Sequence, residues 1–280
     1  MWKKIGISLV VVIFIITLAV SSGDYMLTKQ VSKEIEALFA NSDDISDTVF
    51  TYEQISNLPE PVQRYFKYSL KEGQPYISYA RLKHDGFFRT AENQKWLPIT
   101  GEEYFTTQPP GFVWVGTVKP FPVVWITARD TYFQGTGNNL IKLFSIITIG
   151  DARGKEIDQG TLARWLAEAA WYPTALLPGE RLQWEAIDSN SARLVFSDAG
   201  ITISATVDFN ENGEIVRLDT DRYRDSSLEK WSGYYREYKE IDGVTIPTEA
   251  EVVWHLESGD FRYARFRVTE IEFNQPSRYE

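Results

Sequence analysis

The chain has 280 residues, with 29 Lys and Arg against 39 Asp and Glu, two His and no Cys. The lack of Cys excludes disulfides, thiolate metal sites and a cysteine nucleophile, and two unrelated His without Cys argue against zinc. The net charge of −10 argues against nucleic acid as a partner. We therefore expect no metal and no cofactor.

The first element in the chain is an apolar segment. Residues 5–20 contain no charge, and Lys3 and Lys4 precede them. As a helix this run spans about 24 Å against a hydrocarbon core of about 30 Å, and residues 21–23 extend it into the interface. The two lysines keep the short N-terminus in the cytoplasm, so the rest of the chain is predicted on the extracytoplasmic side. We expect residues 5–22 to cross the membrane.

A cleaved signal peptide is the alternative for this segment. Ala19 and Ser21 have the spacing of small residues at a cleavage site. We favour the retained anchor, and both interpretations place the folded part outside the cytoplasm. Residues 1–23 are therefore predicted to be a transmembrane anchor or a signal peptide.

Residues 24–75 are predicted to be a helical stalk and a linker. Leu27, Val31, Ile35 and Leu38 recur at helical spacing, which indicates an amphipathic helix that leaves the membrane. A second helix is expected from Pro59 to Leu70, because proline is favoured at a helix start.

From residue 76 the hydrophobic period changes to two, which indicates strands. In the first half, strands are expected over Ile77–Arg89, Lys95–Thr107, Gly111–Lys119, Val123–Phe133 and Asn138–Ile149. A single interior helix follows at 158–171, and seven further strands are expected between Leu182 and Phe273. Tight turns such as Asn212-Gly213 force antiparallel neighbours.

The predicted fold is mainly β (α+β). About twelve long strands exceed what a flat open sheet tolerates, so the sheet must curl or close. We predict a curved antiparallel half-barrel over residues 76–280, packed around the 158–171 helix and preceded by an N-terminal transmembrane helix. In Phe112–Val118 both faces are apolar, so this strand is expected to be covered on both sides.

Several short motifs occur in a recognisable order along the chain. They are Trp96-Leu97-Pro98-Ile99-Thr100, Pro109-Pro110-Gly111-Phe112-Val113-Trp114, Glu156-Ile157-Asp158-Gln159-Gly160, Trp231-x-Gly233 and Glu251-Val252-x-Trp254. In this order they resemble a bacterial family of exported or single-pass proteins known only as a domain of unknown function. More distantly, the architecture is similar to the periplasmic lipoprotein-carrier (LolA/LolB-like) half-barrels that hold acyl chains. Fold alone does not assign function.

Catalytic signals are weak. The chain has no G-x-S-x-G or S-x-x-K motif. His84 shares a strand face with apolar residues and is expected to be a hydrogen-bonded core histidine. No catalytic residue is therefore assigned, although a hydrolase or lyase that uses Asp158, Glu168 and Arg222 in the concave face is kept as an alternative.

The aromatic residues are the stronger functional candidates. Tyr104, Trp114 and Trp125 fall on consecutive predicted strands, and Trp165 and Trp171 fall on the predicted helix. If the sheet curls around that helix, these rings either fill the core or line a cavity for an apolar ligand. The sequence thus predicts a membrane-tethered extracytoplasmic protein that binds a lipid-like ligand or an envelope partner without catalysis. A purely structural envelope module is the remaining alternative.

Overall fold

The structure is a computed structural model that describes residues 2–280, with side chains described from residue 11 onward. Its helices are α1 (Trp2–Ala40), α2 (Glu60–Ser69) and α3 (Lys155–Glu168), and short 3-10 turns are η1 (Tyr52–Ile55), η2 (Ala169–Trp171) and η3 (Pro173–Leu176). The strands are β1 (Tyr79–Phe88), β2 (Leu97–Thr107), β3 (Pro110–Phe121), β4 (Val124–Phe133), β5 (Thr136–Leu143), β6 (Ile147–Ala152), β7 (Leu182–Ala186), β8 (Ser191–Asp198), β9 (Ile201–Phe209), β10 (Ile215–Arg224), β11 (Ser227–Ile241), β12 (Val244–Leu256) and β13 (Gly259–Phe273).

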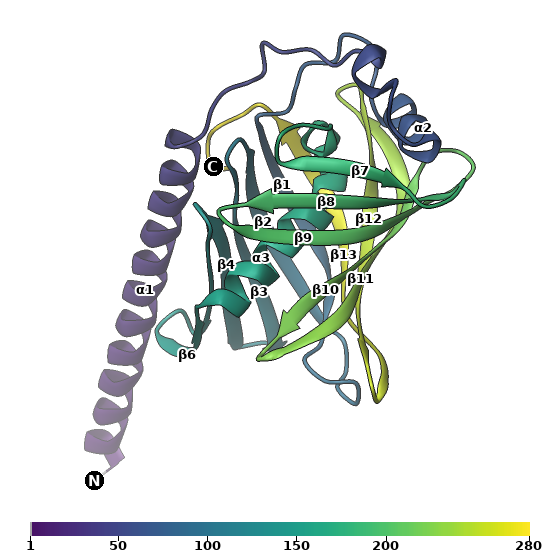
Figure 1. The fold of residues 1–280 in the computed structure, drawn as a ribbon. Helices are drawn as coiled ribbons and strands as arrows, with labels where there is room; N and C mark the ends of the chain where they lie inside the picture. The colour runs from purple at the N-terminus through teal and green to yellow at the C-terminus, as the bar shows by residue number, and fades with distance from the viewer. Residues whose placement is uncertain (1) are drawn as a thin grey trace.

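The thirteen strands form one antiparallel sheet in the order β6-β5-β4-β3-β2-β1-β13-β12-β11-β10-β9-β8-β7. Two meanders are joined at the middle by the pairing of β1 with β13. The sheet bends into a half-barrel, and α3, which connects its two edge strands, lies in the concave side (Figure 1). The predicted mainly-β half-barrel around one interior helix is confirmed.

One expected strand is in fact two. The segment Asn138–Ile149 contains a turn between β5 and β6. Phe144 and Ser145 have φ of 54° and 61°, and this left-handed backbone reverses the chain. Neither residue is a glycine or an asparagine, which are the usual sequence signals for such a turn.

The convex face of the first meander is covered by α1, which is continuous from the apolar run to Ala40. Leu27, Val31, Ile35 and Leu38 of α1 form a buried cluster with residues of the convex face, among them Val113. The neighbours of Val113 on β3 belong instead to the main core on the concave side. The prediction that this strand is covered on both sides is therefore confirmed.

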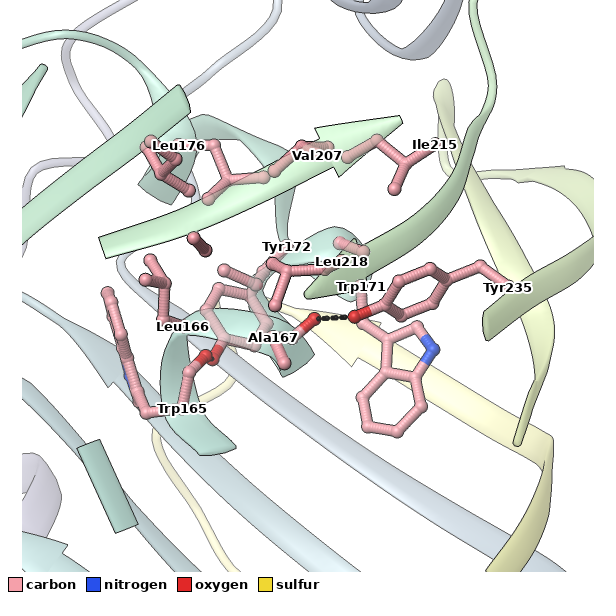
Figure 2. Close-up of a cluster of buried hydrophobic side chains, with 14 of the residues drawn as sticks. Trp165, Leu166, Ala167, Trp171, Tyr172, Leu176, Val207, Ile215, Leu218 and Tyr235 are labelled. Carbon is pink, nitrogen blue, oxygen red and sulfur yellow. Dashed lines mark hydrogen bonds between the residues drawn. The ribbon is translucent and has the colours of Figure 1, made fainter. Parts of the chain in front are cut away.

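The concave face has two unlike ends. At the end nearest the β2–β3 turn, which we call the packed end, Trp165 stacks on Phe196 with ring centroids 5.0 Å apart. Tyr172 packs on Phe105 at 4.7 Å. Figure 2 shows this core around the end of α3, with Trp165 and Trp171 on opposite sides of Ala167. The opposite end, nearest the β1–β2, β3–β4 and β5–β6 turns, we call the open end.

Candidate functional site

A cavity of about 600 Å³ lies between the sheet and α3 at the open end. Its walls are mostly apolar and come from both meanders. The larger aliphatic residues of the lining are Leu97, Ile99, Val118, Ile126, Ile141, Ile149 and Val252. The aromatic lining comprises Phe88, Trp114, Trp171, Trp231, Tyr235, Tyr263 and Phe266.

One stripe of the interior helix forms the inner wall. Arg164, Ala167, Glu168 and Trp171 follow the spacing that places side chains on one side of a helix. On the sheet, Ala128, Gly233 and Ala250 contribute little volume, whereas their strand neighbours are large. The void therefore lies where small residues of the sheet face this stripe.

Trp114 is held in the wall by two neighbours. Its indole Nε1 donates a 2.8 Å hydrogen bond to Nε2 of His84. A Cβ at Gly116 would lie 2.3 Å from the Trp114 ring, so glycine is required for the indole to lie against its own strand. Burial, aided by the nearby Arg164 charge, lowers the pKa of His84 to about 4. His84 is thus neutral and buried, as the sequence predicts.

Arg164 is the centre of a buried charge cluster beside the cavity. Its guanidinium contacts Glu103 at 2.7 Å, Asp130 at 2.8 Å and Glu168 at 2.7 Å. It also lies 4.7 Å from the centroid of the Trp114 ring. All three guanidinium nitrogens are therefore engaged by carboxylates, and three acids surround one base.

Burial sets the protonation of this cluster. It raises the pKa of Glu103 well above the ordinary range, although Arg164 acts in the opposite direction. Burial likewise raises the pKa of Glu168. Three carboxyl groups share one guanidinium in a dry site, so the uncharged forms of Glu103 and Glu168 are favoured more than in an exposed glutamate.

Arg222 is a second cation in the wall, and its side chain points into the concave side, as its alternation on the strand indicates. Its Nε donates to the Gly160 carbonyl at 2.8 Å, and Nη1 donates to the Tyr263 hydroxyl at 3.3 Å. The guanidinium lies 5.1 Å from the Trp231 ring centroid. A backbone carbonyl, a hydroxyl and aromatic faces take the place of a buried carboxylate partner.

Two buried polar atoms of the wall lack hydrogen-bond partners among the described residues. They are Oε2 of Glu168 and Nε1 of Trp171. Such atoms are rare in folded proteins because each forfeits the hydrogen bonds it makes with water. Both belong to residues that line the cavity.

The five predicted ligand-binding aromatics do not share one space. Trp114 and Trp171 line the cavity. Tyr104 lies on the convex face under α1, 6.3 Å from the Phe39 ring centroid. Trp165 belongs to the packed end, where its Nε1 donates to the Thr106 carbonyl at 3.0 Å. Trp125 lies near the β5–β6 turn, where its Nε1 donates to Ser145 Oγ at 3.4 Å.

The residues of the catalytic alternative are also divided. Glu168 and Arg222 line the cavity, but Asp158 accepts a hydrogen bond from the Gly137 amide at 2.7 Å and ties α3 to β5. Asp158 lies inside α3, which begins at Lys155, so the helix starts three residues earlier than predicted. Within the described part of the chain, no group of three or more His, Asp or Glu residues is arranged to hold a metal ion.

Glu103, Asp130 and the central role of Arg164 were not predicted from the sequence. One signal was available: Glu103 shares its strand face with the apolar Phe105. A carboxyl group on a buried face requires a partner. The sequence could not identify that partner, because Arg164 is 61 residues away.

The model of a family described as "Family of unknown function (DUF6544)" matches residues 48–266. No curated protein sequence matches the chain. Among solved structures, a LolA superfamily protein from Nitrosomonas europaea is 11% identical, with 77% of this chain and 92% of that chain covered and a TM-score of 0.41. A porin-like protein from Bacteroides uniformis is 9% identical, with 70% and 96% covered and a TM-score of 0.28.

Proposed function

The chain belongs to the DUF6544 family, a family of unknown function, and we propose that it is a membrane-anchored extracytoplasmic protein that binds an apolar or lipid-like molecule in the open-end cavity. The cavity of about 600 Å³ carries this proposal. Its size falls within the range of about 300–1,000 Å³ for small-molecule sites, which are mainly apolar with few polar groups. Trp114 and Trp171 are the aromatic contacts that we assign to the ligand.

The polar wall favours a particular kind of ligand end. Arg164 is already neutralised by carboxylates, so it offers no free charge to an acidic head group. The unpaired Trp171 Nε1 is available as a hydrogen-bond donor in the cavity wall. A ligand end that accepts hydrogen bonds, such as a hydroxyl or an amide carbonyl, suits this donor and the Arg222 guanidinium in the same wall.

The N-terminal helix supports the membrane location. α1 has one candidate membrane span, and its residues from Val11 to Leu18 are largely exposed. An exposed apolar helix surface is stable when lipid covers it. We assign residues 5–22 to the membrane as a retained anchor, with the sheet on the extracytoplasmic side.

Photolabelling of the full chain tests ligand binding. The chain is reconstituted in phosphatidylcholine vesicles that contain a long-chain alcohol with a photoreactive diazirine on its chain. We expect cross-links on peptides that contain Trp114 or Trp171, and competition by excess unlabelled alcohol. Cross-links on residues 5–22 report contact with bulk lipid and serve as an internal control.

A matched pair of variants locates the label. Ala128→Trp places an indole in the cavity wall and should abolish the competed cross-links, whereas Ala186→Trp, at the exposed end of β7, should leave them unchanged. Labelling of residues 5–22 without any competed label on the cavity peptides would contradict the proposal.

Acid–base catalysis in the same cavity is the second candidate. It is favoured by Glu168, which lines the cavity and whose pKa is raised by burial, in the direction that a general acid requires. A hydrolase or lyase of this kind would consume a lipid supplied in the vesicles and lose that activity in Glu168→Gln. Recovery of every supplied lipid unchanged by mass spectrometry would exclude this candidate for those lipids and leave binding.

A further inference from the structure

The position of α1 on the sheet defines which end of the molecule faces the membrane. A Cβ at Gly23 would lie 2.0 Å from Ile146 Cγ2, so the helix backbone touches the β5–β6 turn at this glycine. Ser145 Oγ donates to Asp24 at 3.1 Å in the same place. Just after the helix ends, the Asp43 amide donates to the Gln108 carbonyl at the β2–β3 turn, 2.7 Å away. α1 therefore runs along the strands from the open end to the packed end.

The apolar run consequently extends beyond the open end. Residues before Gly23 continue as the same unbroken helix past the ends of the strands (Figure 1). The docked part is fixed by more than apolar contacts, because Glu34 pairs with the buried Arg129 at 3.4 Å. Arg278 also donates to Ser32 Oγ at 2.7 Å. A bilayer that contains residues 5–22 would therefore lie directly beyond the open end.

The open end carries exposed apolar side chains where that bilayer would begin. The tip of the β3–β4 hairpin presents Phe121, 67% exposed, and Val123, 77% exposed. Ile147, at the start of β6, is 51% exposed. Trp125 packs its ring against Phe144 at 5.2 Å, in the β5–β6 turn that α1 touches. Tryptophan at the boundary between an apolar span and a folded domain is typical of a membrane interface.

The mouth of the cavity lies at this end as well. The lining reaches Thr90 and Gln94, which are exposed residues of the β1–β2 turn. In an antiparallel meander the β1–β2, β3–β4 and β5–β6 turns share one end of the sheet. The other end of the concave face is filled by the aromatic core of the packed end.

We propose that the open end rests on the outer surface of the bilayer that α1 crosses, with Phe121 and Val123 inserted among the lipids. The cavity then opens onto the membrane, and its ligand enters from the lipid phase without crossing water. The bilayer is the occupant of this apolar surface because the surface is continuous with the membrane-spanning helix. Apolar side chains that would otherwise face water are stabilised by this contact.

Depth measurements on the full chain test the proposal. The chain has no Cys, so single-cysteine variants can be labelled at one position with an environment-sensitive NBD fluorophore. Phe121→Cys and Val123→Cys report the hairpin tip. Ile187→Cys, 47% exposed in the turn after β7, is the matched control with comparable exposure. Each labelled chain is reconstituted in phosphatidylcholine vesicles with and without doxyl-labelled lipid.

The three possible outcomes are distinct. We expect labels at 121 and 123 to show blue-shifted emission, quenching by doxyl lipid and protection from aqueous iodide. The label at 187 should show unshifted emission, no quenching by doxyl lipid and quenching by iodide. Iodide quenching at 121 and 123 equal to that at 187 would overturn the proposal. Protection from iodide without doxyl quenching would also overturn it, since a protein partner would then cover the tip.

A second measurement connects the surface to ligand entry and rests on the proposed function. The double variant Phe121→Asp, Val123→Asp should weaken membrane contact of the open end, measured as doxyl quenching of a label at Ile147→Cys in the neighbouring β5–β6 region. It should also slow photolabelling of the cavity peptides. Because both substitutions are on an exposed tip, the fold should be retained. Unchanged labelling would show that ligand reaches the cavity by another route. Failure of all cavity labelling would contradict only the proposed function.

Discussion

The packed end and the open end of the concave face both contain large aromatic residues. These residues fill the packed end, whereas at the open end they border a cavity. At the packed end two large polar aromatics are held by hydrogen bonds: Tyr172 OH donates to the Trp165 carbonyl at 2.8 Å, and Trp184 Nε1 donates to the Leu176 carbonyl at 2.9 Å. At the open end Trp171 Nε1 has no partner among the described residues, and its ring borders a void.

The difference indicates which aromatics hold the fold together and which serve a ligand. A closely packed cluster contributes to the stability of the fold without a bound ligand. A wall with unpaired polar atoms and empty volume lacks contacts that a bound molecule can supply. We therefore expect substitutions at the packed end to affect stability, and substitutions at the open end to affect binding more than stability.

The largest effect is expected from Trp165→Ala. The substitution empties the most buried part of the packed end and removes the hydrogen bond to the Thr106 carbonyl, so the free energy of unfolding should fall by about 3–5 kcal/mol. Trp171→Ala, next to an existing void, should cost less while abolishing photolabelling. The stability losses of the two variants are compared by chemical unfolding of the full chain in mild detergent, monitored through the circular dichroism signal of the strands. Equal losses would remove the distinction between the two ends.

Arg164→Met tests whether the charge cluster of the open end is structural. Removing the guanidinium leaves buried carboxyl groups without their cation, which should cost about 3–5 kcal/mol at neutral pH and less at acid pH, where they are protonated. Arg193→Met is the control, because its pair with Glu185 is half exposed and should contribute at most about 1 kcal/mol. A loss in Arg164→Met no larger than in the control would contradict this account.

The lowered pKa of His84 predicts that the free energy of unfolding decreases as the pH falls. The raised pKa values of Glu103 and Glu168 predict the opposite trend. Between pH 6.5 and about 4 the unfolded chain binds a proton at His84 that the folded chain does not, so the free energy of unfolding falls by up to about 3 kcal/mol. The raised pKa of Glu103 and Glu168 acts with the opposite sign over acid pH. His84→Gln should therefore make unfolding stability rise, relative to the unaltered chain, as pH falls. An identical pH profile for both chains would exclude a buried neutral His84.

The smallest effect comes from adding volume at matched alanines. Ala163→Leu, in the fully packed part of α3, should cost about 1–3 kcal/mol through strain. Ala128→Leu, in the cavity wall, should cost little because the added methyl groups enter empty space. The comparison uses the same unfolding assay, and an equal cost at both positions would indicate that the cavity does not persist in solution.

The sequence was sufficient for the fold because its signals are local. Strict alternation, turns such as Asn212-Gly213 and the apolar stripe of the interior helix specify an antiparallel meander that must curl around that helix. The β5–β6 turn was missed because Phe144 and Ser145 adopt positive φ without the residues that usually signal it. The start of α3 was predicted three residues too late, at Asp158. The Asp158 carboxylate accepts a hydrogen bond from the Gly137 amide of β5 and does not cap the helix.

The site was predicted only in part. Alternation assigns Glu103 and Phe105 to one face and Tyr104 to the other, but both faces are apolar because α1 and α3 cover opposite sides. The sequence could not decide which face is concave, so Tyr104 was grouped with Trp114. Two of the partners of Arg164, Glu103 and Asp130, also come from strands that are 61 and 34 residues away in the chain.

The amino-acid sequence by itself determined the apolar N-terminal segment, the strand and turn pattern and the presence of one interior helix, because each depends on neighbours a few residues apart. Only the tertiary structure decided which rings pack and which border a void, where the charges gather, and which end of the sheet lies beside the apolar helix. Those features depend on the curvature of the sheet and on the rotation of α3 within it, and no local pattern encodes either one.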